Sequence, residues 1–253
     1  MKVLLVKIMP MYSIRIPETY QVAVSYPLIP PSTLIGTISY TFSVLGYCGK
    51  SGGQVWRDRV KECLDFTRNH VLKARDTSII DGELPIVKWS LVLHIIRGGV
   101  LEENRMPTNI EEFKGGFLDA MVREFALSHP RTVLVIPKDE DSIDLLKRAL
   151  WLMGRFGNSE SWASTTSVTV TDAERCNDRN INVIVKYNQN RISGGFTVVK
   201  ATDEVGIESM FALPVTSGRR GDVYYPSTMS YGGDTLCARL NGASIVFPGG
   251  EDW

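Results

Sequence analysis

The order of strand-like and helix-like segments is the feature that most constrains the fold of this chain. Residues 2–8 are almost continuously apolar and β-branched, as in a strand buried within a sheet. Apolar residues at helical spacing follow, and later segments return to a β-prone composition. The expected elements after the first strand are helices over about 32–47 and 54–73, strands over 86–96 and 131–136, a helix from about 139 and a strand over 163–171.

This order is typical of an α+β sandwich of the ferredoxin-like or RRM type, in which two helices cover one face of a four-stranded antiparallel sheet. An insertion at about 98–121 interrupts it with the glycine, proline and acidic residues of loops. We expect residues 1–172 to form this domain and residues 173–253 to form a smaller β-rich C-terminal region. No segment matches the motif with which RRM modules stack RNA bases, so the fold class alone assigns no function.

Composition limits the kinds of partner. The chain has 253 residues with 28 basic and 28 acidic side chains, so its formal net charge is zero. A protein that coats nucleic acid through its overall field is therefore not expected, and only local basic patches remain. No apolar run approaches the roughly 20 residues that cross a bilayer, and the amino terminus has no signal-peptide pattern. We expect a cytoplasmic protein with no membrane partner.

The four cysteines are far apart in the sequence, at positions Cys48, Cys63, Cys176 and Cys237. They form no Cys-x-x-Cys pair, and no histidine stands at the spacing of a zinc ligand. The pattern predicts buried or inert thiols instead of a disulfide framework. No metal ion and no cofactor is expected.

Residues 30–36, with the sequence Pro-Pro-Ser-Thr-Leu-Ile-Gly, predict an abrupt helix start. The prolines hold the incoming chain extended and tolerate the first helical positions, and Ser32 or Thr33 is a candidate cap. Gly36 lies inside the helix, where glycine costs roughly 1 kcal/mol relative to alanine. Close approach of another backbone or of a phosphate would compensate for this cost. The alternative is a helix start packed under a loop.

Residues 155–161 form a second candidate segment, between a predicted helix and the last strand of the sandwich. Arginine, glycine and small hydrogen-bonding side chains suit contact with phosphate or ribose oxygens. The alternative is an ordinary glycine-containing helix stop. The residues concerned are Arg155, Gly157, Asn158, Ser159 and Ser161.

Two further basic clusters are visible. Residues 56–75 carry six cations and three anions on a predicted amphipathic helix, which is either a solvated face or a binding patch. Arg219 and Arg220 stand between glycines in a predicted loop, where they either grip phosphate or form an exposed tip.

Together, residues 30–36, the interrupted sandwich and residues 155–161 resemble the fifth family of CRISPR-associated proteins, in the form found in type I-A Cascade complexes. The resemblance covers about residues 1–172. It implies a RAMP-superfamily fold and a non-catalytic RNA-binding subunit that holds the 5′ handle of the CRISPR RNA. Such a subunit caps the filament of backbone subunits, abuts the large subunit, and meets target DNA only through the complex.

Carried onto this sequence, the resemblance places the RNA handle near Ser32, Thr33 and Gly36 and against the 155–161 segment. The insertion at 98–121 is similar to the family's thumb, which reaches toward the neighbouring backbone subunit. Its acidic residues Glu102, Glu103, Glu111 and Glu112 are expected to face protein or solvent. The reasonable RNA contacts in this region are Arg97, Arg105, Lys114 and Arg123.

Two other functions stay open. Some members of this family cut precursor RNA without a metal, which needs side chains that activate the 2′-hydroxyl and protonate the leaving oxygen. The candidates are His70, His94, His129, Tyr12, Tyr20 and Lys88, and no sequence spacing assembles them. We therefore expect no enzymatic activity. The other alternative is a protein-interaction module without an RNA role.

Overall fold

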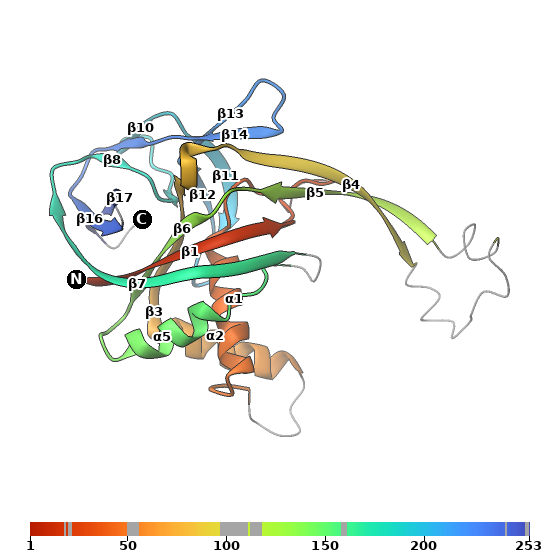
Figure 1. Cartoon of the computed structure of the whole chain (residues 1–253), viewed down its shortest axis with the longest axis horizontal. Coiled ribbons are helices and arrows are strands. Elements are labelled where there is room, and N and C mark those ends of the chain that lie inside the picture. Colours follow the sequence, from red (N-terminus) through yellow and green to blue (C-terminus); the bar gives the residue numbers. More distant parts are fainter. Residues whose placement is uncertain are drawn as a thin grey trace.

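The structure is a computed structural model that describes residues 1–17, 19, 22–49, 56–96, 111, 118–157, 161–240, 242–250 and 253. It is mostly antiparallel β-sheet with few helices, as Figure 1 shows. The N-terminal elements are β1 (Lys2–Tyr12), β2 (Val22–Ala23), α1 (Pro31–Val44), α2 (Trp56–His70), β3 (Val71–Ile80), a 3-10 turn (Asp81–Glu83), β4 (Ile86–Ile96), β5 (Leu118–Leu127), β6 (Arg131–Pro137), α5 (Ser142–Trp151) and β7 (Trp162–Cys176).

Short strands fill the rest of the chain. They are β8 (Asn180–Ile181), β9 (Val185–Lys186), β10 (Ile192–Gly194), β11 (Thr197–Thr202), β12 (Glu208–Leu213), β13 (Val215–Ser217), β14 (Val223–Pro226), β15 (Met229–Tyr231), β16 (Thr235–Leu240) and β17 (Ala243–Pro248).

Four strands in the order β7-β1-β6-β3 form the centre of the large sheet, and each is antiparallel to its neighbours. Leu5 of β1, for example, lies between Leu134 of β6 and Thr169 of β7. Helices α1 and α2 connect β1 to β3, and α5 connects β6 to β7. All three helices lie below the sheet in Figure 1.

Alternation along β1 gives the sheet two apolar faces. Leu4 and Val6 pack into one core with residues of α1 and α5, whereas Val3 and Leu5 pack into a second core with β16 and β17. Both faces of the central strands are therefore covered. This explains why residues 2–8 are almost continuously apolar instead of alternating.

The C-terminal region extends β7 and covers the second face. β16 pairs with the end of β7, and β17 pairs with β16. Two separate three-stranded sheets have the orders β10-β15-β8 and β11-β12-β9. The division between residues 172 and 173 stays a prediction, and β7 runs across that position to Cys176.

The expected strand over 86–96 is present as β4, but its predicted place in the sandwich is wrong. β4 pairs with β5 and β14, and the β4–β5 hairpin extends the sheet away from its four central strands (Figure 1). The place beside β6 that was predicted for β4 is taken by β3, whose charged residues Lys73, Arg75 and Asp76 interrupt the apolar pattern of a strand. The predicted helix to residue 73 ends at His70. Of the predicted insertion, residues 98–110 and 112–117 lie outside the described residues.

Ion pairs explain how β3 buries charges. Asp76 and Arg131 are both fully buried and 2.8 Å apart, and Asp76 also accepts the amide of Ile29 at 2.7 Å. Arg131 donates to the hydroxyl of Tyr12 at 2.9 Å. Burial raises the pKa of the Tyr12 hydroxyl far above its ordinary value. This network connects β1, β3 and β6 to the segment that precedes α1.

The expectation of unpaired thiols is wrong. Cys48 is disulfide-bonded to Cys63, and Cys176 to Cys237. The pairs are 15 and 61 residues apart in sequence, yet their Cα atoms are 5.2 and 5.8 Å apart. Sequence spacing could not reveal this, because the pairing depends on the packing of α1 against α2 and of β7 against β16.

No helix among the described residues is long and apolar enough to span a bilayer.

Candidate functional site

The two segments singled out in the sequence meet at a groove of about 510 Å³ on the helical side of the molecule. Thr37 of α1 donates its hydroxyl to the carbonyl of Arg155 at 3.1 Å, which joins the helix to the 155–157 loop. The structure therefore brings Thr33 and Gly36 together with Arg155 and Gly157. The groove is lined by Thr33, Gly36, Thr37, Tyr40, Trp56, Val60, Arg155 and Gly157.

Gly36 forms an open part of the groove wall. A Cβ atom added there would meet nothing within 4 Å among the described atoms, so no close backbone within this part of the chain explains the glycine. Its cost of about 1 kcal/mol in a helix is thus not offset by packing that the structure describes. The space above it is accessible to a ligand.

The predicted cap at Ser32 or Thr33 is wrong. The N-cap is Pro30 and makes no side-chain capping bond, while the amides of Thr33 and Leu34 donate to the Pro30 carbonyl at 3.0 and 3.2 Å. Prolines 30 and 31 have no N–H and are buried. Of the first amides of the helix, only that of Ser32 is left without a described acceptor, so the helix start by itself is a weak anion site. The two prolines fit the alternative interpretation of this segment, a helix start that is packed under other residues.

Arg155 supplies the positive charge of the groove. Its guanidinium carbon lies 4.4 Å from the centroid of the Tyr40 ring, and the side chain is exposed. No described carboxylate pairs with it within salt-bridge distance. The stacking on Tyr40 orients a cation at the groove edge with its hydrogen-bond donors available.

Gly157 is required by the loop itself. Its φ of 81° is left-handed, and a Cβ there would come within 3.2 Å of Ile14 Cγ1. Ser161 is 6% exposed, and its hydroxyl accepts the amide of Ser13 at 3.1 Å. We therefore assign Ser161 to anchoring the loop, because a hydroxyl in this position presents almost no surface to a ligand. Asn158 and Ser159 lie outside the described residues.

Two aromatic side chains of the groove were missed in the sequence. Tyr40 is 50% exposed and Trp56 is 68% exposed. Tyr40 stands four residues after Gly36 on the same face of α1, a signal that the sequence contains. Nothing in the sequence places Trp56 there, because its position depends on how α2 packs on α1.

Three of the six cations predicted on the basic helix are engaged in contacts within the protein and are therefore not available to a ligand. Arg75 pairs with Glu204 at 3.1 Å and is fully buried, Lys73 donates to the Trp253 carbonyl, and Arg68 donates to the Glu204 carbonyl. The remaining cations are exposed on α2, and they are Arg57, Arg59 and Lys61.

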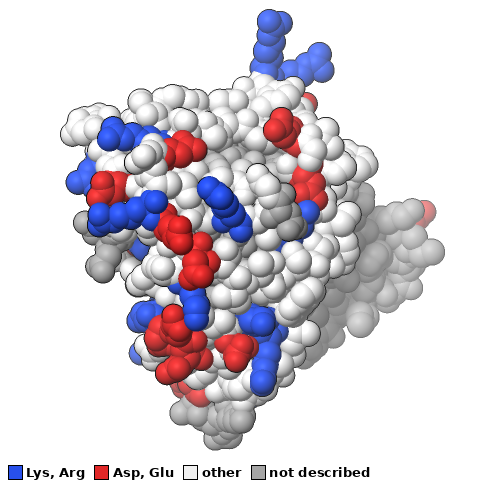
Figure 2. All heavy atoms as spheres, turned by 60° about the vertical axis from the view of Figure 1, so that its left-hand side comes forward, with Lys and Arg blue, Asp and Glu red and all other residues white. Residues whose placement is uncertain are grey.

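The other predicted contacts do not line the groove where they are described. Arg219 and Arg220 are exposed at the tip of the β13–β14 hairpin, and Arg123 is half-buried on β5. Arg97, Arg105 and Lys114 lie outside the described residues. Figure 2 shows cations and anions interspersed on the face it presents, in keeping with the zero net charge.

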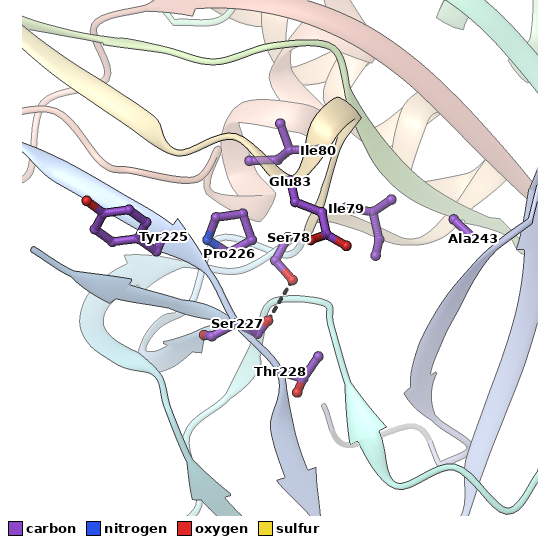
Figure 3. Close-up of a pocket in the computed structure, with 9 residues that line it drawn as sticks. All are labelled: Ser78, Ile79, Ile80, Glu83, Tyr225, Pro226, Ser227, Thr228 and Ala243. Carbon is purple, nitrogen blue, oxygen red and sulfur yellow. Dashed lines mark hydrogen bonds between the residues drawn. The ribbon is translucent and has the colours of Figure 1, made fainter.

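A second cavity, of about 540 Å³, lies between the end of β3, the β14–β15 connection and the start of β17 (Figure 3). There Ser78 donates its hydroxyl to the carbonyl of Ser227 at 2.8 Å. The one charged side chain among the residues that line it is the carboxylate of Glu83. A polyanion is therefore disfavoured here relative to the groove that holds Arg155.

The candidate catalytic residues are dispersed. The Tyr12 hydroxyl is buried against Arg131, and Lys88 is paired with Glu124 at 2.9 Å. His70 Nδ1 lies 2.8 Å from the Phe66 carbonyl, and His129 is in an exposed bend. The His94 side chain and Tyr20 are outside the described part of the chain. Within that part, no cluster of three or more His, Cys, Asp or Glu residues could hold a metal ion.

No protein-family model matches the chain. A curated protein from Thermoproteus tenax, named CRISPR-associated protein Cas5, is 31% identical over 244 residues, which cover 96% of each chain. Among solved structures, the crystal structure of a CRISPR protein from Archaeoglobus fulgidus is 14% identical, with coverage of 99% of this chain and 100% of that one and a TM-score of 0.49. The first relationship extends over nearly the whole of both sequences.

Proposed function

This chain belongs to the Cas5 family of CRISPR-associated proteins, and from this premise we propose that it is a non-catalytic RNA-binding subunit of a Cascade-type interference complex. Its role is to hold the 5′ handle of the CRISPR RNA. The observation that carries this proposal is the groove at which Gly36 of α1 meets Arg155, a cation with no described acidic partner.

The groove suits a segment of RNA backbone. An arginine forms charge-assisted bonds to phosphate oxygens, and a glycine in open space lets a ribose or phosphate approach the helix more closely than any side chain allows. Few such contacts are needed if other subunits hold the rest of the RNA, which fits the zero net charge.

The finer assignments follow the same family. The order β7-β1-β6-β3 with crossover helices supports a ferredoxin-like fold of the RAMP superfamily. In this proposal the projecting β4–β5 hairpin belongs to the thumb and meets the neighbouring backbone subunit. The protein caps the filament beside the large subunit of a type I-A complex in the cytoplasm, and reaches target DNA only through that complex.

The alternative of a metal-independent endoribonuclease has one feature in its favour, since Tyr40 carries an exposed phenol in the groove. Proton transfer at both the 2′-hydroxyl and the leaving oxygen needs a second group, and the described lining contains no histidine, lysine or carboxylate. Repeat-containing RNA should therefore stay intact when incubated with the protein and a chelator. Specific cleavage that disappears in Tyr40→Phe would contradict the non-catalytic assignment.

Binding of a labelled RNA that carries the repeat-derived 5′ segment tests the main proposal. Arg155→Ala should weaken binding and reduce the salt slope by about one unit, because one phosphate contact is lost. Gly36→Glu should nearly abolish binding through bulk and like charge. Matched controls are Arg239→Ala, an exposed arginine on β16, and Gly250→Glu, a glycine that also has open space around it. Equal affinity of all four variants and the wild type would overturn the proposal.

A further inference from the structure

The groove presents two exposed aromatic rings, which a site for the sugar-phosphate backbone of RNA does not need. We propose that it seats one unstacked nucleobase of the bound RNA, on the ring of Trp56 and on the Tyr40 ring that Arg155 covers. This inference rests on the proposed RNA-holding function and names the part of the RNA that the groove recognises.

The exposure of the rings is the first observation. Trp56 is 68% exposed and Tyr40 is 50% exposed, and both line the same groove. Large aromatic side chains left in water beside a cation are the usual composition of a stacking platform for single-stranded nucleic acid. A single exposed aromatic ring is ordinary on a protein surface. Two exposed rings and an arginine that line the same groove indicate a binding site.

The geometry of Arg155 is the second observation. Its guanidinium carbon lies over the Tyr40 ring, 4.4 Å from the ring centroid, as in a cation–π contact. Unstacked RNA bases stack on arginine guanidinium planes as well as on aromatic rings. The same guanidinium edge remains available to the phosphate that adjoins the seated base.

The size and wall of the groove fit a base. A volume of about 510 Å³ is within the range of pockets that hold small organic ligands. The open space at Gly36 gives the ribose and phosphate room to pass over α1 while the base turns inward. Thr33 lies on the same wall, whereas Thr37 is only 7% exposed and uses its hydroxyl to hold the Arg155 carbonyl.

Charge decides between a base and a protein side chain as the occupant. The described lining contains Arg155 and no carboxylate, and the next residue after Trp56, Arg57, is exposed at the same end of α2. Such a setting favours an aromatic group attached to an anionic chain over an apolar or cationic side chain of a partner protein.

A double-mutant cycle between protein and RNA tests the seat. Binding is measured for the 5′-segment RNA and for a series in which each nucleotide in turn is abasic. With the wild-type protein, one abasic position should weaken binding about 5- to 150-fold, the range for loss of one base–aromatic stack. Trp56→Ala should bind the intact RNA more weakly by a similar factor. Its affinity should not fall further when that same position is abasic. Trp56→Phe should lose less, because it keeps a stacking face.

The matched control is Trp151→Ala, since Trp151 is 49% exposed at the end of α5 and does not line the groove. This variant should show the same loss of RNA affinity at each abasic position as the wild type. If Arg155→Ala weakens RNA binding but no abasic position is coupled to Trp56, the base seat is wrong and the handle assignment stands. If the wild-type protein does not retain the RNA, both are wrong.

Discussion

At the scale of single residues, Gly36 connects stability to function most directly. It occupies a helical position where alanine would be more stable by about 0.5–1 kcal/mol, and the structure offers an alanine methyl group open space. In the proposed function, the RNA that passes close to the helix accounts for this glycine.

Gly36→Ala should therefore raise the free energy of unfolding by about 0.5–1 kcal/mol while it weakens RNA binding. Denaturant unfolding and RNA titration of the same preparation measure the two effects. An alanine variant that is more stable and binds RNA as tightly as the wild type would show that no ligand approaches Gly36.

One residue that the sequence led us to misplace is a buried charge. Arg75 was expected on a basic surface helix, but it lies on β3 and is paired with Glu204, which is 129 positions further along the chain. A local pattern contains no information about such a distant partner. The predictions for Gly36 and Arg155 rest on chemistry that is local to each segment, and only their place in one groove required the fold.

At the scale of elements, α2 packs on α1, with the Phe66 ring centroid 5.2 Å from that of Phe42, and is also bonded covalently to the chain that follows α1. Only Cys63 and Thr67 are buried among its described residues, and Cys63 is bonded to Cys48 just beyond the end of α1. Glu62 also accepts the amide of Gly49 at 3.0 Å. The disulfide therefore holds α2, and with it Trp56, beside the groove.

Replacing Cys48 and Cys63 together by serine should lower the free energy of unfolding by about 3 kcal/mol and weaken RNA binding, because Trp56 is no longer held in place. The matched pair Cys176→Ser and Cys237→Ser should cost about 4 kcal/mol, since its closed loop is longer, and should leave RNA binding unchanged. Thermal unfolding and RNA titration check both pairs. Equal loss of RNA binding in the two variants would contradict a positioning role for the first disulfide.

The elements themselves were only partly predictable. Most of the expected strands and helices exist, because apolar runs and helical spacing are strong local signals. The exception is β3, where three charged residues within four positions interrupt the apolar pattern. Because of this interruption, the sequence predicted β4 in the place that β3 takes beside β6. β4 has the stronger β-forming composition, but it lies in the β4–β5 hairpin.

At the scale of the whole molecule, the central strands are covered on both faces and joined by buried polar groups. Asp76, Arg131 and Tyr12 connect three strands, and Asp76 also fixes the amide of Ile29 just before the α1 prolines. The same network thus supports the fold and the start of the helix that forms the groove.

Arg131→Met should lower the free energy of unfolding by about 3–5 kcal/mol, because it leaves the carboxylate of Asp76 buried without its partner. The double variant Asp76→Asn with Arg131→Met should recover part of this loss, because the uncompensated charge is removed. Denaturant unfolding of the two variants measures the difference. A double variant less stable than Arg131→Met would contradict this account of the network.

The most direct measurement of the central claim is photo-crosslinking of the RNA within the assembled ribonucleoprotein. A CRISPR RNA with a photoreactive uridine at successive positions of its 5′ segment is irradiated, and the crosslinked peptides are identified by mass spectrometry. Crosslinks are expected to residues 33–40, 56–60 and 155–157, the segments that contain the groove lining. Crosslinks confined to residues 78–83 and 225–228 of the other cavity, or to the β13–β14 tip, would contradict it.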